Sequence, residues 1–238
     1  MAAHLFAAID VGSFELEMGI YETTSRNGLR EIDHLRHVIS LGRDTYHTGK
    51  ISYHLVDEMC QVLEEFAQVM KSYQVEDYRA YATSAMREAK NSQIILEQIR
   101  VRTGIQVQVI SNSEQRFLGY KAIAMKEAEF QKIIQKGTAI ADVSFGSLQI
   151  SLFDKDSLVS TQNIQQGILR LRENLSGVWS DRQTVLGIFE DMVDNELYAF
   201  KKMYLKDRDI KNLICIGESI LYPVSYTHLR AHETDQYL

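Results

Sequence analysis

The alternation of apolar and polar positions predicts an order of strands and helices that begins a second time in the chain. Residues 4–12 form an apolar run typical of a buried strand, and residues 16–22 alternate with a period of two. The other elements expected in the first half are a strand at 29–42, a helix at 51–73, a strand at 78–84, a helix at 90–102, a strand at 105–110 and a helix at 113–130. The order predicts an α/β fold.

The same order restarts after residue 137. Strands are expected at 138–146, 148–154 and 158–164, a long helix at 181–204 and a last strand at 212–217. The first long helix, with Ser52 as its N-cap, carries one apolar face made of Leu55, Met59, Val62, Leu63, Phe66, Val69, Met70 and Tyr73. Val185, Phe189, Met192, Val193, Leu197, Phe200 and Tyr204 mark the apolar face of the second. We therefore expect two lobes, at residues 1–130 and 131–223.

Composition limits the function classes. The chain has 238 residues, 45% of them hydrophobic, and a formal net charge of 26 − 32 = −6. This net charge gives no basic signature of nucleic-acid binding, and no apolar run approaches the roughly 20 residues of a membrane span. Two cysteines, Cys60 and Cys215, are too few for a disulfide framework. A cytoplasmic protein without nucleic-acid or membrane partners is the expectation.

The end of the chain needs separate treatment. The stretch VSYTHLRAHET, residues 224–234, resembles the translation of a common sequencing-library adapter. We therefore interpret residues 224–238 as a non-native tail and exclude them from the fold. The second lobe is then expected to be truncated near Pro223.

Each half of the chain carries a strand that ends on an aspartate and enters a Gly/Ser turn. Asp10 precedes Val-Gly-Ser, and Asp142, 132 residues later (142 − 10), precedes Val-Ser-Phe-Gly-Ser. Successive N–H groups in such a turn can bind an anion, and the aspartate can hold hydrated Mg²⁺. Alternatively, each aspartate simply accepts hydrogen bonds within its turn. The repetition at domain spacing favours two turns that face one phosphate across a cleft.

Several motifs resemble one family. AAIDVGS, YATSAMREAKN, IQVQVISNSEQRFLGYKA, ADVSFGSLQISL, QQGILRLRE and CIGES occur in the order found in the exopolyphosphatase / guanosine pentaphosphate phosphatase (Ppx/GppA) family. The resemblance covers residues 5–222. It implies an actin-like fold of two ribonuclease-H-like lobes, the first complete and the second truncated.

The resemblance also implies roles for particular residues. Asp10, Gly12 and Ser13 fall on the first phosphate loop, and Thr83, Ser84 and Arg87 fall on a segment that lines the cleft. Asp142, Gly146 and Ser147 fall on the second loop, with Gly167 and Gly217 on later turns near it. Arg87 is the expected cation for phosphate, because its fork can bind two oxygens at once; a surface salt bridge, for example with Glu88, is the alternative.

The first departure of this sequence from the family lies at the position of the catalytic base. The family has a glutamate, its proposed general base, where this chain has Gln115, and an amide cannot take a proton from water. Such a loss typically lowers the rate by about 10² to 10⁴. Gln115 could still orient water. Glu114 is a second candidate base, although consecutive helical residues point about 100° apart.

The two loops also depart from the family. Ser144 and Phe145 replace glycines in the second loop, where we expect them to crowd phosphate and to strain any position with positive φ. Leu148 and Gln149 replace a threonine and a glutamate. In the first loop Phe14 replaces an asparagine, and Glu15 replaces a serine and is expected to bring a negative charge toward an anionic ligand.

The expected function is hydrolysis of terminal phosphoanhydrides in polyphosphate or guanosine polyphosphate, with reduced or lost activity in this chain. Mg²⁺ on Asp10 and Asp142 is implied by the resemblance, and a homodimer through the missing carboxy-terminal part is a further expectation. The alternative is a non-catalytic module that binds a nucleotide or a protein, which hydrophobic Phe14 and Phe145 at the turns would favour.

Overall fold

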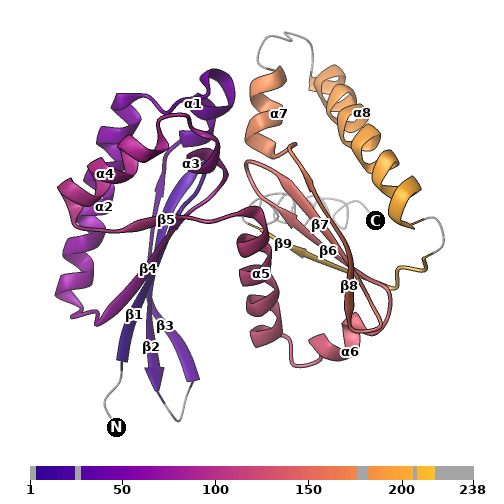
Figure 1. Ribbon diagram of the computed structural model, residues 1–238, viewed down its shortest axis with the longest axis horizontal. Coiled ribbons are helices and arrows are strands. Elements are labelled where there is room, and N and C mark those ends of the chain that lie inside the picture. Colours follow the sequence, from indigo (N-terminus) through magenta and orange to yellow (C-terminus); the bar gives the residue numbers. More distant parts are fainter. Residues whose placement is uncertain (1–3, 25–27, 176–181, 206–207, 218–238) are drawn as a thin grey trace, which may run out of the picture. The chain divides into compact units, whose positions relative to one another are not determined.

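The computed structural model describes residues 4–24, 28–175, 182–205 and 208–217 (Figure 1). The described chain divides into two compact units, one ending at Gln115 and the other beginning at Arg116. Each unit is built around its own sheet. The tail expected at 224–238 lies outside the described residues. No helix in the described ranges has the length and hydrophobicity that crossing a membrane requires.

The first unit contains a five-stranded sheet in the order β3-β2-β1-β4-β5. Its strands are β1 (His4–Val11), β2 (Glu15–Thr24), β3 (Gly28–Val38), β4 (Asp77–Ala82) and β5 (Val107–Val109). Strand β2 pairs antiparallel with both β1 and β3. Strand β4 pairs parallel with β1, and β5 pairs parallel with β4. The expected hairpin and its third strand are confirmed.

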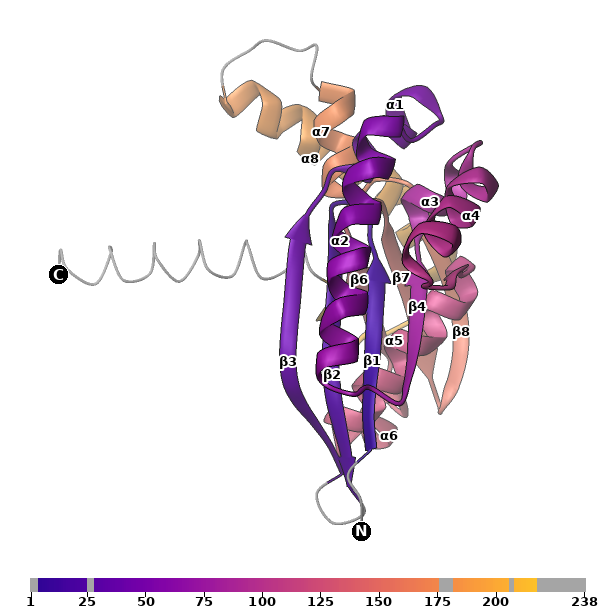
Figure 2. The ribbon, with the colours of Figure 1, turned by 90° about the vertical axis from the view of Figure 1, so that its left-hand side faces the viewer.

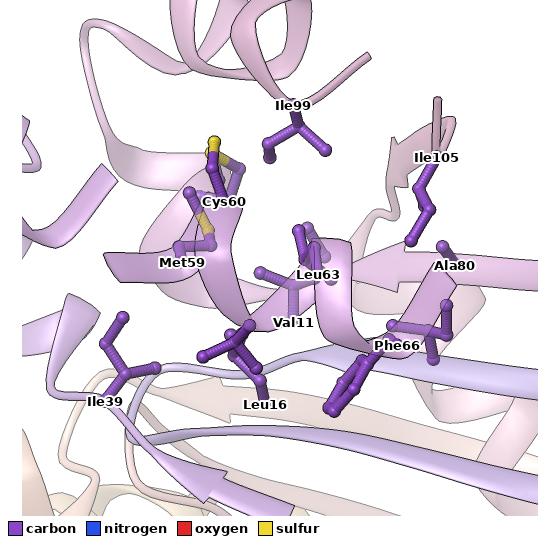
Figure 3. Close-up of a cluster of buried hydrophobic side chains, with 14 of the residues drawn as sticks. Val11, Leu16, Ile39, Met59, Cys60, Leu63, Phe66, Ala80, Ile99 and Ile105 are labelled. Carbon is purple, nitrogen blue, oxygen red and sulfur yellow. The ribbon is translucent and has the colours of Figure 1, made fainter. Parts of the chain in front are cut away.

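Strand β2 explains why one face of this sheet is covered. Leu16, Met18 and Ile20 alternate with more polar residues and are fully buried. Helix α2 (Tyr53–Ser72) lies along this face, and α4 (Ser92–Thr103) packs beside α2 (Figure 2). Figure 3 shows Met59, Cys60, Leu63 and Phe66 of α2 in one buried cluster with Val11 and Leu16 of the sheet. The expected apolar face of α2 is therefore confirmed, although Ser52 makes no side-chain capping bond.

Two short helices depart from the sequence-based expectation. The strand expected at 29–42 ends at Val38, and α1 (Leu41–Thr48) follows it. The strand expected at 78–84 ends at Ala82, and α3 (Ser84–Glu88) begins two residues later. Gly49 closes α1 in the left-handed region, with φ of 75°. These two helices bring residues from two distant segments of the chain to the first turn.

The second unit contains a four-stranded sheet in the order β8-β7-β6-β9. Its strands are β6 (Thr138–Val143), β7 (Leu148–Asp154), β8 (Ser157–Ile164) and β9 (Asn212–Ile216). Strand β6 pairs antiparallel with β7 and parallel with β9, as β1 does with β2 and β4. The repeat in the sequence is thus a repeat of topology.

The helical elements of the second unit are α5 (Asn112–Lys126), which begins at the end of the first unit, α6 (Phe130–Ile134), α7 (Ile168–Leu175), α8 (Arg182–Phe200) and the π-helical turn η1 (Lys201–Leu205). Ile123 of α5 and Phe130 of α6 pack with Ile140 and Phe153 of the second sheet. Ile123 is the buried residue of α5, and Tyr120 packs partly buried beside it, so the start of the second unit at Arg116 follows the packing of α5. The lobe boundary near residue 130 stays a prediction.

Candidate functional site

The first turn, between β1 and β2, is held by one backbone hydrogen bond. The N–H of Gly12 donates to the carbonyl of Glu15 over 3.0 Å. A Cβ atom at Gly12 would lie 2.8 Å from that carbonyl oxygen, so the turn excludes a side chain here. Asp10, two residues earlier, is in register with Glu17 on β2 and with Tyr81 on β4.

The second turn, between β6 and β7, is built in the same way. The N–H of Ser144, again two residues after the aspartate, donates to the carbonyl of Ser147 over 3.0 Å, and the Ser144 hydroxyl donates to it over 2.9 Å. None of residues 144–147 has a positive φ. The expected strain is therefore wrong, because this loop turns without left-handed residues. Phe145 is only 7% exposed.

Two glycines pack against the second turn, as expected from the sequence. A Cβ at Gly167 would lie 2.3 Å from the Phe145 carbonyl oxygen, and the N–H of Leu169 donates to the same oxygen over 2.9 Å. Nε of Arg170 donates to the carbonyl of Gly146 over 3.2 Å. Gly217 has φ of 114°, and a Cβ there would lie 2.3 Å from the Val143 carbonyl oxygen. The backbone of three segments thus converges at this turn.

Asp142 occupies the end of β6 beside this turn. It is in register with Gln149 on β7 and with Ile216 on β9. Burial raises the pKa of its carboxyl from 3.8 to about 6. Nη1 of Arg116 donates to Oε1 of Gln149 over 3.5 Å, and the Gln149 side chain is only 1% exposed. The residue opposite Asp142 on β7 is thus a neutral amide and not a second acid.

Three hydroxyl groups meet next to the first turn. Oγ of Ser13, Oη of Tyr46 and Oγ of Ser84 lie 2.8 Å from one another in all three pairs. Ser13 comes from the turn, Tyr46 from α1 and Ser84 from the start of α3. The N–H of Thr83 donates to the carbonyl of Val11 over 3.3 Å and fixes α3 beside β1. Sequence reasoning identified both serines but not Tyr46.

Arg87, on α3, is partly buried and connects to the start of α5. Its Nη1 donates to the carbonyl of Ile110 over 2.7 Å, and its Nη2 donates to Oδ1 of Asn112 over 2.5 Å. Burial lowers the pKa of the guanidinium from its ordinary value. The two hydrogen bonds make Arg87 a link between the segment at residues 81–91 and the segment that carries Gln115.

The start of α5 distinguishes the two candidate bases. Ser111 and Glu114 form a capping box, in which the N–H of Ser111 donates to the Glu114 carboxylate over 2.8 Å and the N–H of Glu114 donates to Oγ of Ser111 over 3.2 Å. These bonds lower the pKa of exposed Glu114. The Gln115 Oε1 atom is buried and has no hydrogen-bond partner among the described residues. The Glu114 carboxylate already caps α5, so Gln115 is the remaining one of the two candidates for the catalytic position.

Glu15 does not present the negative charge that the sequence suggested. Its side chain is 1% exposed, and Nε and Nη2 of Arg36 on β3 both contact its Oε2 atom. Burial, followed by the charge of Glu15, raises the pKa of neighbouring Glu17. The expectation is corrected because a cation from the adjacent strand compensates the new carboxylate.

Acidic side chains decide whether the two turns suit Mg²⁺. In the described part of the chain, no three His, Cys, Asp or Glu side chains gather as a metal site would require. Mg²⁺ is, however, commonly held by one or two carboxylates, with water and substrate phosphates completing its shell. Asp10 and Asp142 each carry a carboxylate of this kind, one in the turn of each unit, so the donor chemistry of each turn by itself suits a metal that arrives with a phosphate ligand.

A cavity of about 480 Å³ lies in the second unit, away from its turn. Its lining includes Gly137, Phe153, Asp154, Tyr204 and Arg208. Gly137 precedes β6, whereas Asp142 is near the opposite end of that strand. The cavity therefore does not contain the residues that the sequence selected.

Comparisons with known proteins agree with the sequence motifs. A family model described as the Ppx/GppA phosphatase family matches residues 20–237. Exopolyphosphatase 1 of Mycobacterium tuberculosis (strain ATCC 25618 / H37Rv) is 26% identical over 115 residues, which are 48% of this chain and 33% of that protein. Guanosine-5'-triphosphate,3'-diphosphate pyrophosphatase of Vibrio parahaemolyticus is 20% identical over 215 residues, 90% of this chain and 41% of that protein. The match thus spans less than half the length of these curated relatives.

Solved structures share the fold. An exopolyphosphatase from Cytophaga hutchinsonii has a TM-score of 0.74 at 20% identity, over 95% of this chain and 72% of that chain. A Ppx/GppA family member from Aquifex aeolicus has a TM-score of 0.67 at 22% identity, over 90% of this chain and 66% of that chain. The expected α/β, actin-like fold class is confirmed.

Proposed function

The chain belongs to the Ppx/GppA phosphatase family, and on this premise we propose that it binds the terminal phosphates of polyphosphate or guanosine polyphosphate and hydrolyses them with reduced or lost activity. The observation that carries the proposal is the repeated turn. In the first unit the N–H of Gly12, two residues after Asp10, donates to the carbonyl of Glu15. In the second unit the N–H of Ser144, two residues after Asp142, donates in the same way to the carbonyl of Ser147. The proposal is that both turns serve one phosphate ligand.

The binding roles follow from the chemistry of each group. Asp10 and Asp142 would hold Mg²⁺, which would supply positive charge to phosphate oxygens. Arg87 has five N–H donors, of which two bind Ile110 and Asn112, so others are available to a phosphate. The hydroxyls of Ser13, Thr83, Ser84 and Ser147 and the backbone amide of Gly146 would add neutral donors, and Gly12, which has no side chain, would let a phosphate oxygen approach the backbone.

Gln115 is the reason to propose slow chemistry. Its buried Oε1 atom can accept a hydrogen bond and so orient a water molecule for attack on the terminal phosphorus. It cannot remove the proton that this water must lose, because an amide has no basic site near neutral pH. General-base catalysis typically contributes about 10² to 10⁴ in rate, which sets the size of the expected loss.

The alternative function is a non-catalytic module that binds a nucleotide or a protein. The amide at position 115 favours it, because binding does not require a base. Buried Phe145 weakens its protein-binding form, since that side chain is not presented to a partner. Phe14 is also partly buried.

The test measures binding and hydrolysis separately. The purified protein is titrated with inorganic tripolyphosphate and with guanosine pentaphosphate in the presence of Mg²⁺, and released phosphate is followed against M. tuberculosis exopolyphosphatase 1. We expect saturable binding with release slower by roughly 10²-fold or more. Absence of binding to both ligands would overturn the proposal. Release at the relative's rate would overturn its reduced-activity part, and binding with no release would identify the non-catalytic form.

A further inference from the structure

We propose that Tyr46 completes a subsite of three hydroxyls, with Ser13 and Ser84, that binds one oxygen of a phosphate group. The inference rests on the proposed function, because it assigns a new residue to the same phosphate ligand. It starts from the three oxygen–oxygen distances of 2.8 Å, which place the hydroxyls at hydrogen-bond distance in every pair. We refer to these three residues as the hydroxyl triangle.

The triangle can change its hydrogen bonding without moving its atoms. Each hydroxyl has one proton to donate and two lone pairs to accept with. In a closed ring of three, every proton points to the next oxygen. When an anionic oxygen arrives, one hydroxyl can turn its proton outward while two bonds of the ring remain. A hydrogen bond to a charged acceptor is roughly twice as strong as a neutral one, so this exchange is favourable.

The backbone holds the triangle in place before any ligand binds. The N–H of Gly42 on α1 donates to the carbonyl of Ser13 over 2.7 Å, and the N–H of Ile39 donates to the carbonyl of Phe14 over 2.7 Å. Ser13 and Ser84 are each only 5% exposed, whereas Tyr46 is partly exposed. The two serines are therefore shielded from bulk water, and Tyr46 is the member of the triangle that is partly exposed to solvent.

A neighbouring cation indicates the charge of the ligand. Arg87 lies on α3 three residues after Ser84, and residues three apart lie on the same face of a helix. Neutral donors next to a guanidinium form a suitable environment for an oxyanion with several oxygens. Phosphate is the class of ligand that could bind the triangle and Arg87 together.

A purely structural role for Tyr46 is the alternative, because the triangle also ties α1 and α3 to the turn. Tyr46→Phe removes one hydroxyl and keeps the aromatic ring. Tyr73→Phe is the matched control: it removes a hydroxyl that donates to Oδ2 of Asp33 over 2.9 Å in the same unit but outside the triangle. The dissociation constant for tripolyphosphate and the melting temperature are measured for the wild type and both variants.

We expect Tyr46→Phe to weaken tripolyphosphate binding by roughly 10- to 100-fold, with Tyr73→Phe binding like the wild type. Ser84→Ala, which leaves Tyr46 in place, should weaken binding similarly and serves if Tyr46→Phe does not fold. If the wild type binds no tripolyphosphate, the proposed function itself fails. If the wild type binds and the triangle variants match it, the subsite is overturned while the proposed function stands. Equal weakening in Tyr46→Phe and Tyr73→Phe would also overturn the subsite, because the effect would then be a general loss of stability.

Discussion

Asp142 at the end of β6 is in register with Gln149 on β7, and the Gln149 side chain is almost fully buried. The corresponding pair in the first unit is Asp10 and Glu17, which are both acids. The second turn therefore has one partly buried carboxylate, and no carboxylate lies directly opposite it on β7. Its raised pKa comes from loss of water rather than from a second negative charge.

Replacing Asp142 by Asn should stabilise the protein at neutral pH. The folded-state pKa of about 6 lies above the ordinary value of 3.8, so the folded protein binds the proton more tightly. Stability from this group is present below about pH 4 and is lost as the pH rises to about 6. We expect Asp142→Asn to raise the free energy of unfolding by roughly 2 to 3 kcal/mol at pH 7.5 and very little at pH 4.

Urea unfolding at both pH values measures this difference, and exposed Asp156→Asn serves as the control. Asp156 has φ of 62°, a conformation that Asn tolerates well. A stability change in Asp142→Asn that is the same at pH 4 and pH 7.5 would contradict the burial argument. Phosphate binding should decrease in the same variant, because the carboxylate is the proposed metal ligand.

Replacing Arg87 by Lys should reduce both stability and ligand binding. A lysine keeps the charge but cannot reach the Ile110 carbonyl and Asn112 Oδ1 together, as the guanidinium does. Loss of these bonds should lower the free energy of unfolding by roughly 1 to 3 kcal/mol, measured by urea titration. Exposed Arg79→Lys is the control. Wild-type stability and tripolyphosphate affinity in Arg87→Lys would exclude this role for Arg87.

Gly217→Ala should destabilise the second unit. Its φ of 114° is unfavourable for alanine, and the added Cβ would lie 2.3 Å from the Val143 carbonyl oxygen. We expect a loss of roughly 2 to 4 kcal/mol by thermal or urea unfolding. Gly187→Ala in α8 is the control, because no atom lies within 4 Å of its added Cβ and alanine favours a helix. Similar stability for both variants would show that the close approach at Gly217 is not required.

The sheets and the first long helix could be predicted because their hydrophobic periods extend over many residues. The apolar residues on each of these elements are regularly spaced, and all of them are buried in the structure: Leu16, Met18 and Ile20 on β2, and Met59, Leu63 and Phe66 on α2. Helices α1 and α3 were missed because eight and five residues are too short to show such a period. The division at Gln115 and Arg116 depends on where Ile123 of α5 packs, which the local sequence does not reveal, and the lobe boundary near residue 130 stays a prediction.

The individual site residues could be selected by motif, whereas their partners depend on long-range contacts. Tyr46 meets Ser13 across 33 residues, and nothing local marks it. Arg36 compensates Glu15 from the neighbouring strand, so the replacement looks unfavourable only when Glu15 is considered alone. The strain expected at Ser144 and Phe145 assumed glycine-like φ angles that this turn does not use.

The most direct test of the reduced-activity account is the rate of phosphate release by Gln115→Glu, measured beside the wild type with tripolyphosphate and Mg²⁺. Exposed Gln93→Glu on α4 controls for the added charge. If the amide is what limits the chemistry, the Gln115 variant should release phosphate roughly 10²-fold faster or more, and Gln93→Glu should not change the rate. A wild type as fast as M. tuberculosis exopolyphosphatase 1, with no gain in Gln115→Glu, would contradict the account.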